Sequence, residues 1–126
     1  MMLLQLLKGF MGNHDLVRLY HMLDCAKSIL KFAEKKQRQD LDSDRFFASA
    51  IMREFEVLGE AASAISTETR SRFQHIPWKA VIGMRNQLIH AYFDIDHDIV
   101  WKTIQTALPE LIPQLEQAIT ITTYST

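Results

Sequence analysis

The chain has 126 residues, enough for one domain with a hydrophobic core, and its 48% hydrophobic and 23% charged residues are typical of a globular protein. A net charge of −1 gives no whole-chain signal for nucleic-acid binding, and the single cysteine, Cys25, excludes an intrachain disulfide and a cysteine metal cluster. The apolar runs are shorter than the roughly 20 residues that cross a membrane, so we expect no membrane association and a reducing, cytoplasmic location.

Residues 1–13 are apolar but have neither the basic segment nor the small-residue cleavage site of a signal peptide. We interpret them as an N-terminal extension that is ordered only if it packs on a partner. Residues 14–126 then form the domain.

Apolar residues three and four positions apart predict a first amphipathic helix. It opens at Asn13 or at His14-Asp15 and runs to about Lys36. Its apolar stripe consists of Leu16, Leu19, Leu23, Ala26, Leu30 and Ala33.

A polar linker over residues 35–44 precedes a second long helix, which Ser43 or Asp44 can cap. The stripe of this helix consists of Phe47, Ile51, Phe55, Leu58, Ala62 and Ile65. Residues 66–76 then form a connecting segment that contains cap-forming residues.

Pro77 stands where a helix can begin, because its missing N–H has no intrahelical partner in the first turn anyway. The third helix therefore covers residues 77–90. Four of its residues are expected to be buried, namely Trp78, Val81, Ile82 and Ile89.

The fourth helix covers residues 98–120, and Asp94 or Asp96 offers a cap for it. Pro109 and Pro113 should kink this helix or divide it into two pieces. Long amphipathic helices with short links predict an all-α protein, an antiparallel bundle of four main helices.

The third helix and the residues after it place a cation, an imidazole and a phenol within eight positions: Arg85, His90 and Tyr92. On a regular helix His90 points about 140° away from Arg85, whereas Tyr92 returns to within about 20° of it. The three side chains can share a site only if the helix ends or unwinds near residues 89–92, or if a second subunit contributes. Geometry alone leaves both routes open.

Charge is unevenly distributed around this segment, because no acidic residue lies between Glu68 and Asp94. The interval carries four fixed cations and two histidines, namely Arg70, Arg72, Lys79, Arg85, His75 and His90. Such an interval would attract a phosphate-bearing ligand, which makes Arg70, Arg72 and Lys79 candidates for binding RNA phosphate. Alternatively, these cations are solvated and pair with acidic faces of neighbouring helices.

Arg85 and His90 could together cleave RNA without a metal ion. The guanidinium is a permanently charged fork suited to phosphate, and the imidazole can accept or return a proton near neutral pH. The ribose 2′-OH is an internal nucleophile beside the scissile phosphate. The sequence lacks a His-Glu-x-x-His pattern and a Gly-rich phosphate loop, so we expect neither a metal nor a cofactor.

The order Arg85, four residues, His90, one residue, Tyr92 resembles the motif of the HEPN superfamily. More closely, it resembles HepT-type toxins encoded beside MNT-type minimal nucleotidyltransferase antitoxins. The blocks "RLYHMLDCAKSI", "FEVLGEAASAIS", "IPWKAVIGMRNQLIHAYFDID" and "DIVWKTIQTALPELI" are also similar to that family. Together they cover about residues 15–118, in the family's order.

The resemblance implies a ribonuclease toxin whose catalytic pair is Arg85 and His90. Asn86 matches the polar position that often follows the arginine. Tyr92 matches the tyrosine that the partner nucleotidyltransferase modifies with AMP to silence the toxin. The family fold is an all-α bundle that forms a two-fold homodimer, with the motif residues of both chains facing a shared cleft.

A second function stays open, because some HEPN domains are not nucleases. The chain could be a non-catalytic binding module that docks a nucleotidyltransferase or a nucleotide. Tyr92 could equally be a partly buried phenol hydrogen-bonded to the next helix.

Other polar residues have simpler interpretations. Glu56 and Glu60 could form a catalytic carboxylate pair, but ion pairs with Arg or Lys of neighbouring helices are the better prediction. Gly59 between them would let another helix approach closely. Four histidines lack a second ligand at useful spacing and are not expected to bind metal, namely His14, His21, His75 and His97.

Overall fold

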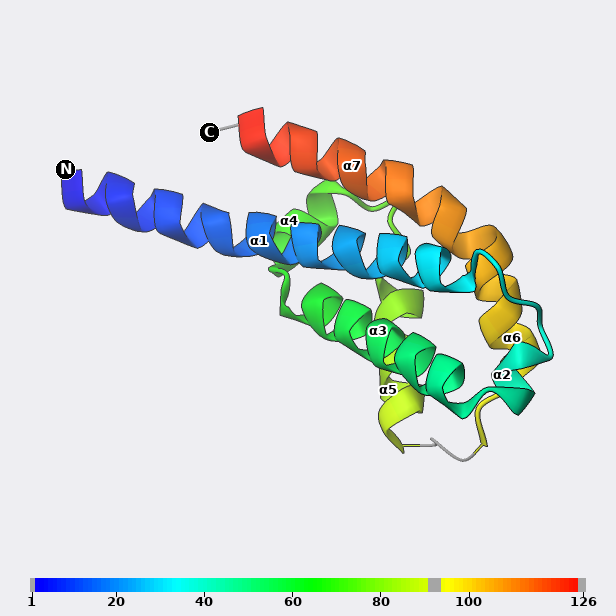
Figure 1. The fold of residues 1–126 in the computed structure, drawn as a ribbon. Coiled ribbons are helices and arrows are strands. Elements are labelled where there is room, and N and C mark those ends of the chain that lie inside the picture. Colours follow the sequence, from blue (N-terminus) through cyan, green and yellow to red (C-terminus); the bar gives the residue numbers. More distant parts are fainter. Residues whose placement is uncertain (1, 91–93, 125–126) are drawn as a thin grey trace.

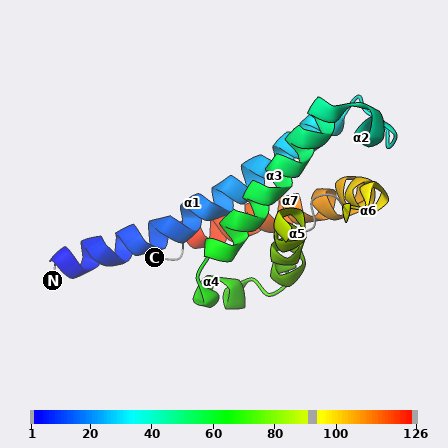
Figure 2. The same cartoon turned by 90° about the horizontal axis from the view of Figure 1, so that it is seen from below.

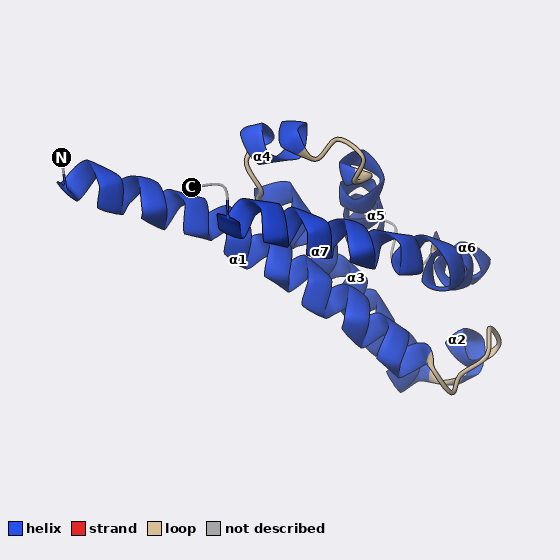
Figure 3. Cartoon of the chain, turned by 90° about the horizontal axis from the view of Figure 1, so that it is seen from above, coloured by secondary structure: helices blue, strands red, loops and turns tan. Residues whose placement is uncertain are grey.

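A computed structural model describes residues 2–90 and 94–124, with side chains from residue 14 onward in those ranges. These residues form helices joined by turns, and no strand occurs among them (Figure 3). The all-α prediction is therefore confirmed. None of the described helices is long and apolar enough to cross a membrane.

The core lies between three long helices, α1 (Met2–Ala33), α3 (Arg45–Ala64) and α7 (Leu108–Tyr124). α1 packs against α3 on one side and against α7 on another (Figures 1 and 2). The predicted stripes of α1 and α3 are buried there or packed against it, as the periodicity required. The largest fully buried side chains of this core include Leu19, Met22, Ile29, Ile51, Phe55 and Leu115.

The bounds predicted for the first helix are wrong at both ends. α1 begins at Met2 rather than at residues 13–15, so the N-terminal extension continues the bundle helix and projects beyond its neighbours (Figure 1). Leucine, methionine, glutamine and lysine favour helix, and no proline interrupts this stretch. α1 ends at Ala33, and the predicted end at Lys36 falls in the following turn, where Lys36 N–H donates to the Ala33 carbonyl at 3.0 Å.

The polar linker contains one short helix, α2 (Asp40–Ser43). Asp44 caps α3, as predicted, by accepting a hydrogen bond from the Phe47 N–H at 3.1 Å. α2 is in turn tied to the helix that follows residue 96. Asp42 accepts from Arg38 at 2.8 Å and lies 2.7 Å from the Nδ1 atom of His97.

The fourth predicted helix is interrupted, but not at its prolines. It consists of α6 (His97–Lys102), which Asp96 caps, a π-helical turn over Thr103–Ala107, and α7. In that turn the Leu108 N–H bonds to the Thr103 carbonyl five residues back. This wider turn makes room for the ring of Pro109, which in a regular helix would clash with the carbonyl four residues before it. α7 then continues through Pro113.

The connecting segment also contains a short helix, α4 (Thr67–Arg72), which is tied to α1. The carboxylate of Asp15 accepts hydrogen bonds from Ser66 N–H at 3.0 Å, from Ser66 Oγ at 2.6 Å and from Thr69 Oγ1 at 2.6 Å. Partial burial acts to raise the pKa of Asp15, but these hydrogen bonds outweigh it and hold the pKa below its ordinary value. Asp15 therefore positions α4 on the bundle.

Candidate functional site

The candidate site is built around α5 (Trp78–His90), which crosses α3 at a steep angle (Figure 1). Its start is set by a tight turn after α4. The buried Trp78 donates its indole N–H to the Phe73 carbonyl at 3.0 Å, and its backbone N–H bonds to the Ile76 carbonyl at 2.8 Å. The helix begins directly after Pro77, as predicted.

The predicted burial along α5 is right at one end and wrong at the other. Trp78 is buried, and Val81 and Ile82 are half-buried. Ile89 is 42% exposed, and the neighbouring Leu88 is buried instead. The error arises because α5 presents only one narrow face to α3, and Ile89 lies outside it.

Gly59 of α3 brings α5 close at one point. A Cβ atom on Gly59 would lie 2.1 Å from the Cβ of Arg85 and 3.1 Å from the Val81 carbonyl oxygen. The first contact is sterically excluded and the second is tight, and both involve atoms at or near the α5 backbone, so α5 itself would have to shift. The packing role predicted for Gly59 is confirmed, and its partner is the helix turn that carries Arg85.

Two interactions orient the Arg85 side chain, which is 30% exposed. Its Nη1 donates to the Asn86 Oδ1 atom at 3.0 Å, and its Nη2 lies 3.8 Å from the Glu60 Oε1 atom of α3. Its Nε is buried and has no hydrogen-bond partner among the described residues. The guanidinium is thus oriented from two sides and keeps a donor available for an anionic oxygen.

His90 is the last residue of α5 and is exposed. Because α5 is helical from Trp78 to His90, the two motif residues of one chain point about 140° apart around the helix. α5 ends at His90, within the interval of residues 89–92 where the helix was expected to end or unwind, so this route stays open beside the route through a second subunit. Tyr92 lies outside the described residues, so the prediction about it has no structural counterpart.

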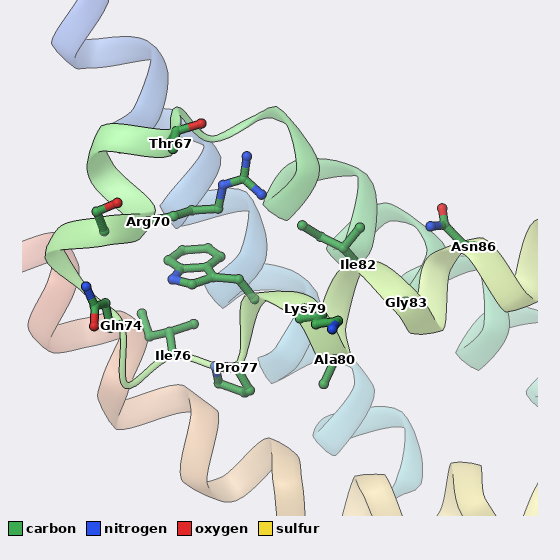
Figure 4. A pocket seen from close by; sticks show the side chains of 12 residues that line it. Thr67, Arg70, Gln74, Ile76, Pro77, Lys79, Ala80, Ile82, Gly83 and Asn86 are labelled. Atoms are coloured by element: carbon green, nitrogen blue, oxygen red, sulfur yellow. The ribbon is translucent and has the colours of Figure 1, made fainter.

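Two of the three predicted phosphate-binding cations line one open groove. Arg70 of α4 and Lys79 of α5 border a groove of about 1180 Å³ that extends along α5 to Asn86 (Figure 4). No aspartate or glutamate lines it among the described residues. Arg72 is not part of this groove, and its guanidinium carbon lies 5.4 Å from the centre of the Phe73 ring.

The two glutamates considered as a catalytic pair both lie near cations, but only Glu60 pairs with a neighbouring helix, as predicted for both. Glu56 lies 3.9 Å from Arg53 within α3, and Glu60 lies 3.8 Å from Arg85. Among the described residues, no group of three or more His, Cys, Asp or Glu side chains could hold a metal ion.

Sequence reasoning did not single out Gly83, which lines the groove between Lys79 and Asn86. A Cβ atom there would meet no atom within 4 Å. The spacing of residues 79, 83 and 86 was the available signal, because positions separated by four and three lie on one helix face. None of these three positions carries an apolar side chain, which indicated that this strip of the helix was uncovered.

Comparison with known proteins now adds to this geometry. The family model described as "Ribonuclease HepT-like" matches residues 22–118. The chain is 32% identical to "Putative RNase MJ1380" of Methanocaldococcus jannaschii, over 78% of this chain and 90% of the relative. It is also 32% identical to "Putative RNase TTE0752" of Caldanaerobacter subterraneus, over 79% and 88% of the two chains.

A third relative is "Probable ribonuclease HepT" of Thermococcus cleftensis, which is 34% identical over 63% of this chain and 72% of the relative. No solved structure matches the chain significantly. The family model covers α3 and α5 in full and parts of α1 and α7. The chain belongs to the ribonuclease HepT-like family.

Proposed function

We propose that this chain is a metal-independent endoribonuclease, the toxin of a toxin–antitoxin pair, and that it acts as a homodimer. Arg85 and His90 are its catalytic residues, and Asn86 supports Arg85. The observation that carries the proposal is the Arg85 side chain, oriented by Asn86 and Glu60 with a buried Nε donor that has no partner among the described residues. Membership of a family whose relatives are named as RNases supports it further.

The reaction is a transesterification within the RNA. The His90 imidazole accepts the proton of a ribose 2′-OH, the 2′ oxygen bonds to the adjacent phosphorus, and the bond from phosphorus to the 5′ oxygen breaks. An imidazolium returns a proton to that leaving oxygen. The products are a 2′,3′-cyclic phosphate and a 5′-OH, and Arg85 stabilises the charge on the pentacoordinate phosphorus.

The separation of Arg85 and His90 around α5 favours a site shared by two copies. Each copy alone directs the two side chains about 140° apart, whereas a two-fold axis beside α5 could bring the arginine of one copy toward the histidine of the other. The His90 that accepted the 2′-OH proton then returns it to the leaving oxygen, so each shared site needs one arginine and one histidine.

Cleavage of RNA by the purified chain tests the catalytic assignment. Arg85→Ala and His90→Ala should each lower the cleavage rate by about 100-fold to 1,000-fold, and EDTA should have no effect. Arg45→Ala and His21→Ala are matched controls, because both residues are exposed and lie outside α5. Equal cleavage by all five proteins would overturn the mechanism.

Mixing the two inactive variants tests the shared site. If subunits exchange, a mixed dimer of Arg85→Ala and His90→Ala keeps one intact arginine and one intact histidine, so activity should partly return. Subunit exchange is followed by mass spectrometry of differently tagged copies. Exchange without recovery of activity would place each site within one copy.

The proposed regulator is an MNT-type nucleotidyltransferase. The Tyr92 phenol oxygen attacks the α-phosphorus of ATP, pyrophosphate leaves, and AMP stays attached to the tyrosine. The modification adds negative charge seven positions after Arg85 in the sequence and would oppose binding of RNA phosphate. Co-expression with the nucleotidyltransferase followed by mass spectrometry should find one adenylyl group on Tyr92, and Tyr92→Phe should abolish it.

The alternative, a non-catalytic module that docks a nucleotidyltransferase or a nucleotide, makes opposite predictions. It requires tight partner binding together with no RNA cleavage and no toxicity on expression. The same purified chain and co-expression experiment therefore separate the two functions.

A further inference from the structure

The groove beside α5 combines an apolar floor with a cationic border. Ile76 and Ile82 contribute to the floor, and Arg70 and Lys79 stand at the border (Figure 4). The nearest acidic residues of these elements are Glu68 in α4 and, across from Arg85, Glu60 in α3, and neither lines the groove. An apolar surface bordered by fixed cations suits a nucleotide, whose base is flat and apolar on its faces and whose phosphate is anionic.

Arg70 has an unused donor in this groove. Its Nε atom is buried and has no hydrogen-bond partner among the described residues, which is also true of the Nε of Arg85. Buried donors of this kind are rare in folded proteins, so each calls for an acceptor. Arg70 lines the groove, and Arg85 is connected to it through Asn86, which lines the groove and accepts a hydrogen bond from Arg85.

We infer that this groove binds the single-stranded RNA segment that flanks the scissile phosphate, with Arg70 and Lys79 holding its phosphates. The inference rests on the proposed ribonuclease function for its substrate. Asn86 is the point where the groove and the catalytic residues meet, because it contacts both. The strand then passes from α4 along α5 toward Arg85.

The size and openness of the groove favour a strand over a free nucleotide. Its volume of about 1180 Å³ exceeds the roughly 300–1,000 Å³ of most small-molecule pockets. Lys79 and Asn86 are seven residues apart, which is about 10 Å along the helix axis. Trp78 is buried and its N–H is occupied, so bases would rest on the aliphatic floor and not stack on its face.

Gly83 provides a charge series that tests the groove without disturbing the core. A side chain at Gly83 enters open space, and replacing a helix-interior glycine raises helix propensity. In a His90→Ala background, which prevents cleavage, we would measure the affinity for a fluorescent single-stranded RNA. The expected order is Gly83→Lys tightest, Gly83→Gln intermediate and Gly83→Glu weakest, with at least tenfold between the two charged variants.

Arg70→Ala tests the phosphate contact directly in the same background. It should weaken RNA binding about tenfold and reduce the dependence of log affinity on log salt by about one unit. Arg45→Ala is the matched control. Arg45 is the first residue of α3, and the end of α3 that leads into α4 is about 30 Å away along the helix axis. Thermal unfolding confirms that each variant is folded.

Three outcomes overturn the inference. The first is equal RNA affinity across the Gly83 series. The second is a loss of affinity in Arg70→Ala no larger than that in Arg45→Ala. The third is competition by free AMP as effective as competition by the RNA, which would make the groove a mononucleotide site. Because the binding variants cannot cleave, the two proposals fail separately. If the native chain binds RNA through Arg70 but does not cleave it, the ribonuclease proposal is refuted and the RNA-binding groove is retained.

Discussion

Gly59 and Gly83 are both helix-interior glycines near Arg85, but they have opposite surroundings. A Cβ on Gly59 would lie 2.1 Å from the Cβ of Arg85, whereas a Cβ on Gly83 would meet no atom within 4 Å. One side of α5 is therefore pressed against α3, and another is open. Arg85 belongs to the first side and Asn86 to the second, so the hydrogen bond between them connects a packed surface to an accessible one.

The difference shows how the fold can hold a catalytic cation while leaving room for substrate. Arg85 owes its position to packing, because α3 can approach only where a glycine stands. The groove is open because none of the helices that the structure describes covers Lys79, Gly83 and Asn86. Changes on the packed side should thus affect stability and activity together, and changes on the open side should affect binding alone.

The largest expected effect is that of Gly59→Ala. The added methyl must push α5 away from α3, which should lower the free energy of unfolding by about 1–3 kcal/mol. A displacement of about 1 Å at Arg85 should lower RNA cleavage by about 100-fold. Denaturant unfolding and a cleavage assay below the unfolding midpoint measure the two effects. A Gly59→Ala protein with native stability would refute the close contact.

Asp15→Asn should weaken the attachment of α4 to α1, and with it the position of Arg70, without touching α5. We expect a loss of about 1–2 kcal/mol, because Asp15 accepts three hydrogen bonds that an amide cannot fully replace. Denaturant unfolding of the wild type and of Asp15→Asn at several pH values measures this difference in the free energy of unfolding.

The difference in stability between wild type and Asp15→Asn should also depend on pH. The folded pKa of Asp15 lies below its ordinary value of 3.8, so the carboxylate contributes its full stability above about pH 4. That contribution is lost as the pH falls through the folded pKa. The gap between wild type and Asp15→Asn should therefore narrow below pH 4, and a gap that widened there would contradict the assignment.

Gly83→Ala should stabilise the protein by about 0.5–1 kcal/mol, because it removes backbone freedom from the unfolded chain and meets no steric barrier in α5. It is the matched control for Gly59→Ala, since the chemical change is the same. Thermal unfolding should show a small rise in midpoint. A destabilised Gly83→Ala would mean that something covers the open side.

Glu60→Gln should have the smallest effect on stability, below about 1 kcal/mol, because the 3.8 Å pair with Arg85 is partly exposed. Glu60→Gln should strengthen RNA binding, because removing the carboxylate frees the Arg85 guanidinium for phosphate. Binding in the His90→Ala background would show it. Weaker RNA binding by Glu60→Gln would mean that Glu60 helps binding by orienting Arg85 more than it hinders binding by its negative charge.

The sequence by itself determined the helical class, the apolar stripes of α1 and α3, and the family, and it narrowed two caps to Ser43 or Asp44 and to Asp94 or Asp96. These features depend on local spacing and on side chains close to their own backbone, so they can be read along the chain. The ends of α1, the π-helical turn ahead of Pro109 and the exposure of Ile89 could not be read in this way. The exposure of Ile89 depends on which face of α5 meets α3, whereas the start of α1 and the π-helical turn depend on local preferences that outweighed the cap and proline signals.

Only the tertiary structure decided how the charged residues are grouped. It put Arg70 and Lys79 on one groove and left Arg72 outside it, although all three lie in the same acid-free interval. It also paired Arg85 with Glu60, which is 25 positions away in sequence. Contacts between helices depend on crossing angle and on where a glycine permits close approach, and no periodicity within one helix encodes either of them.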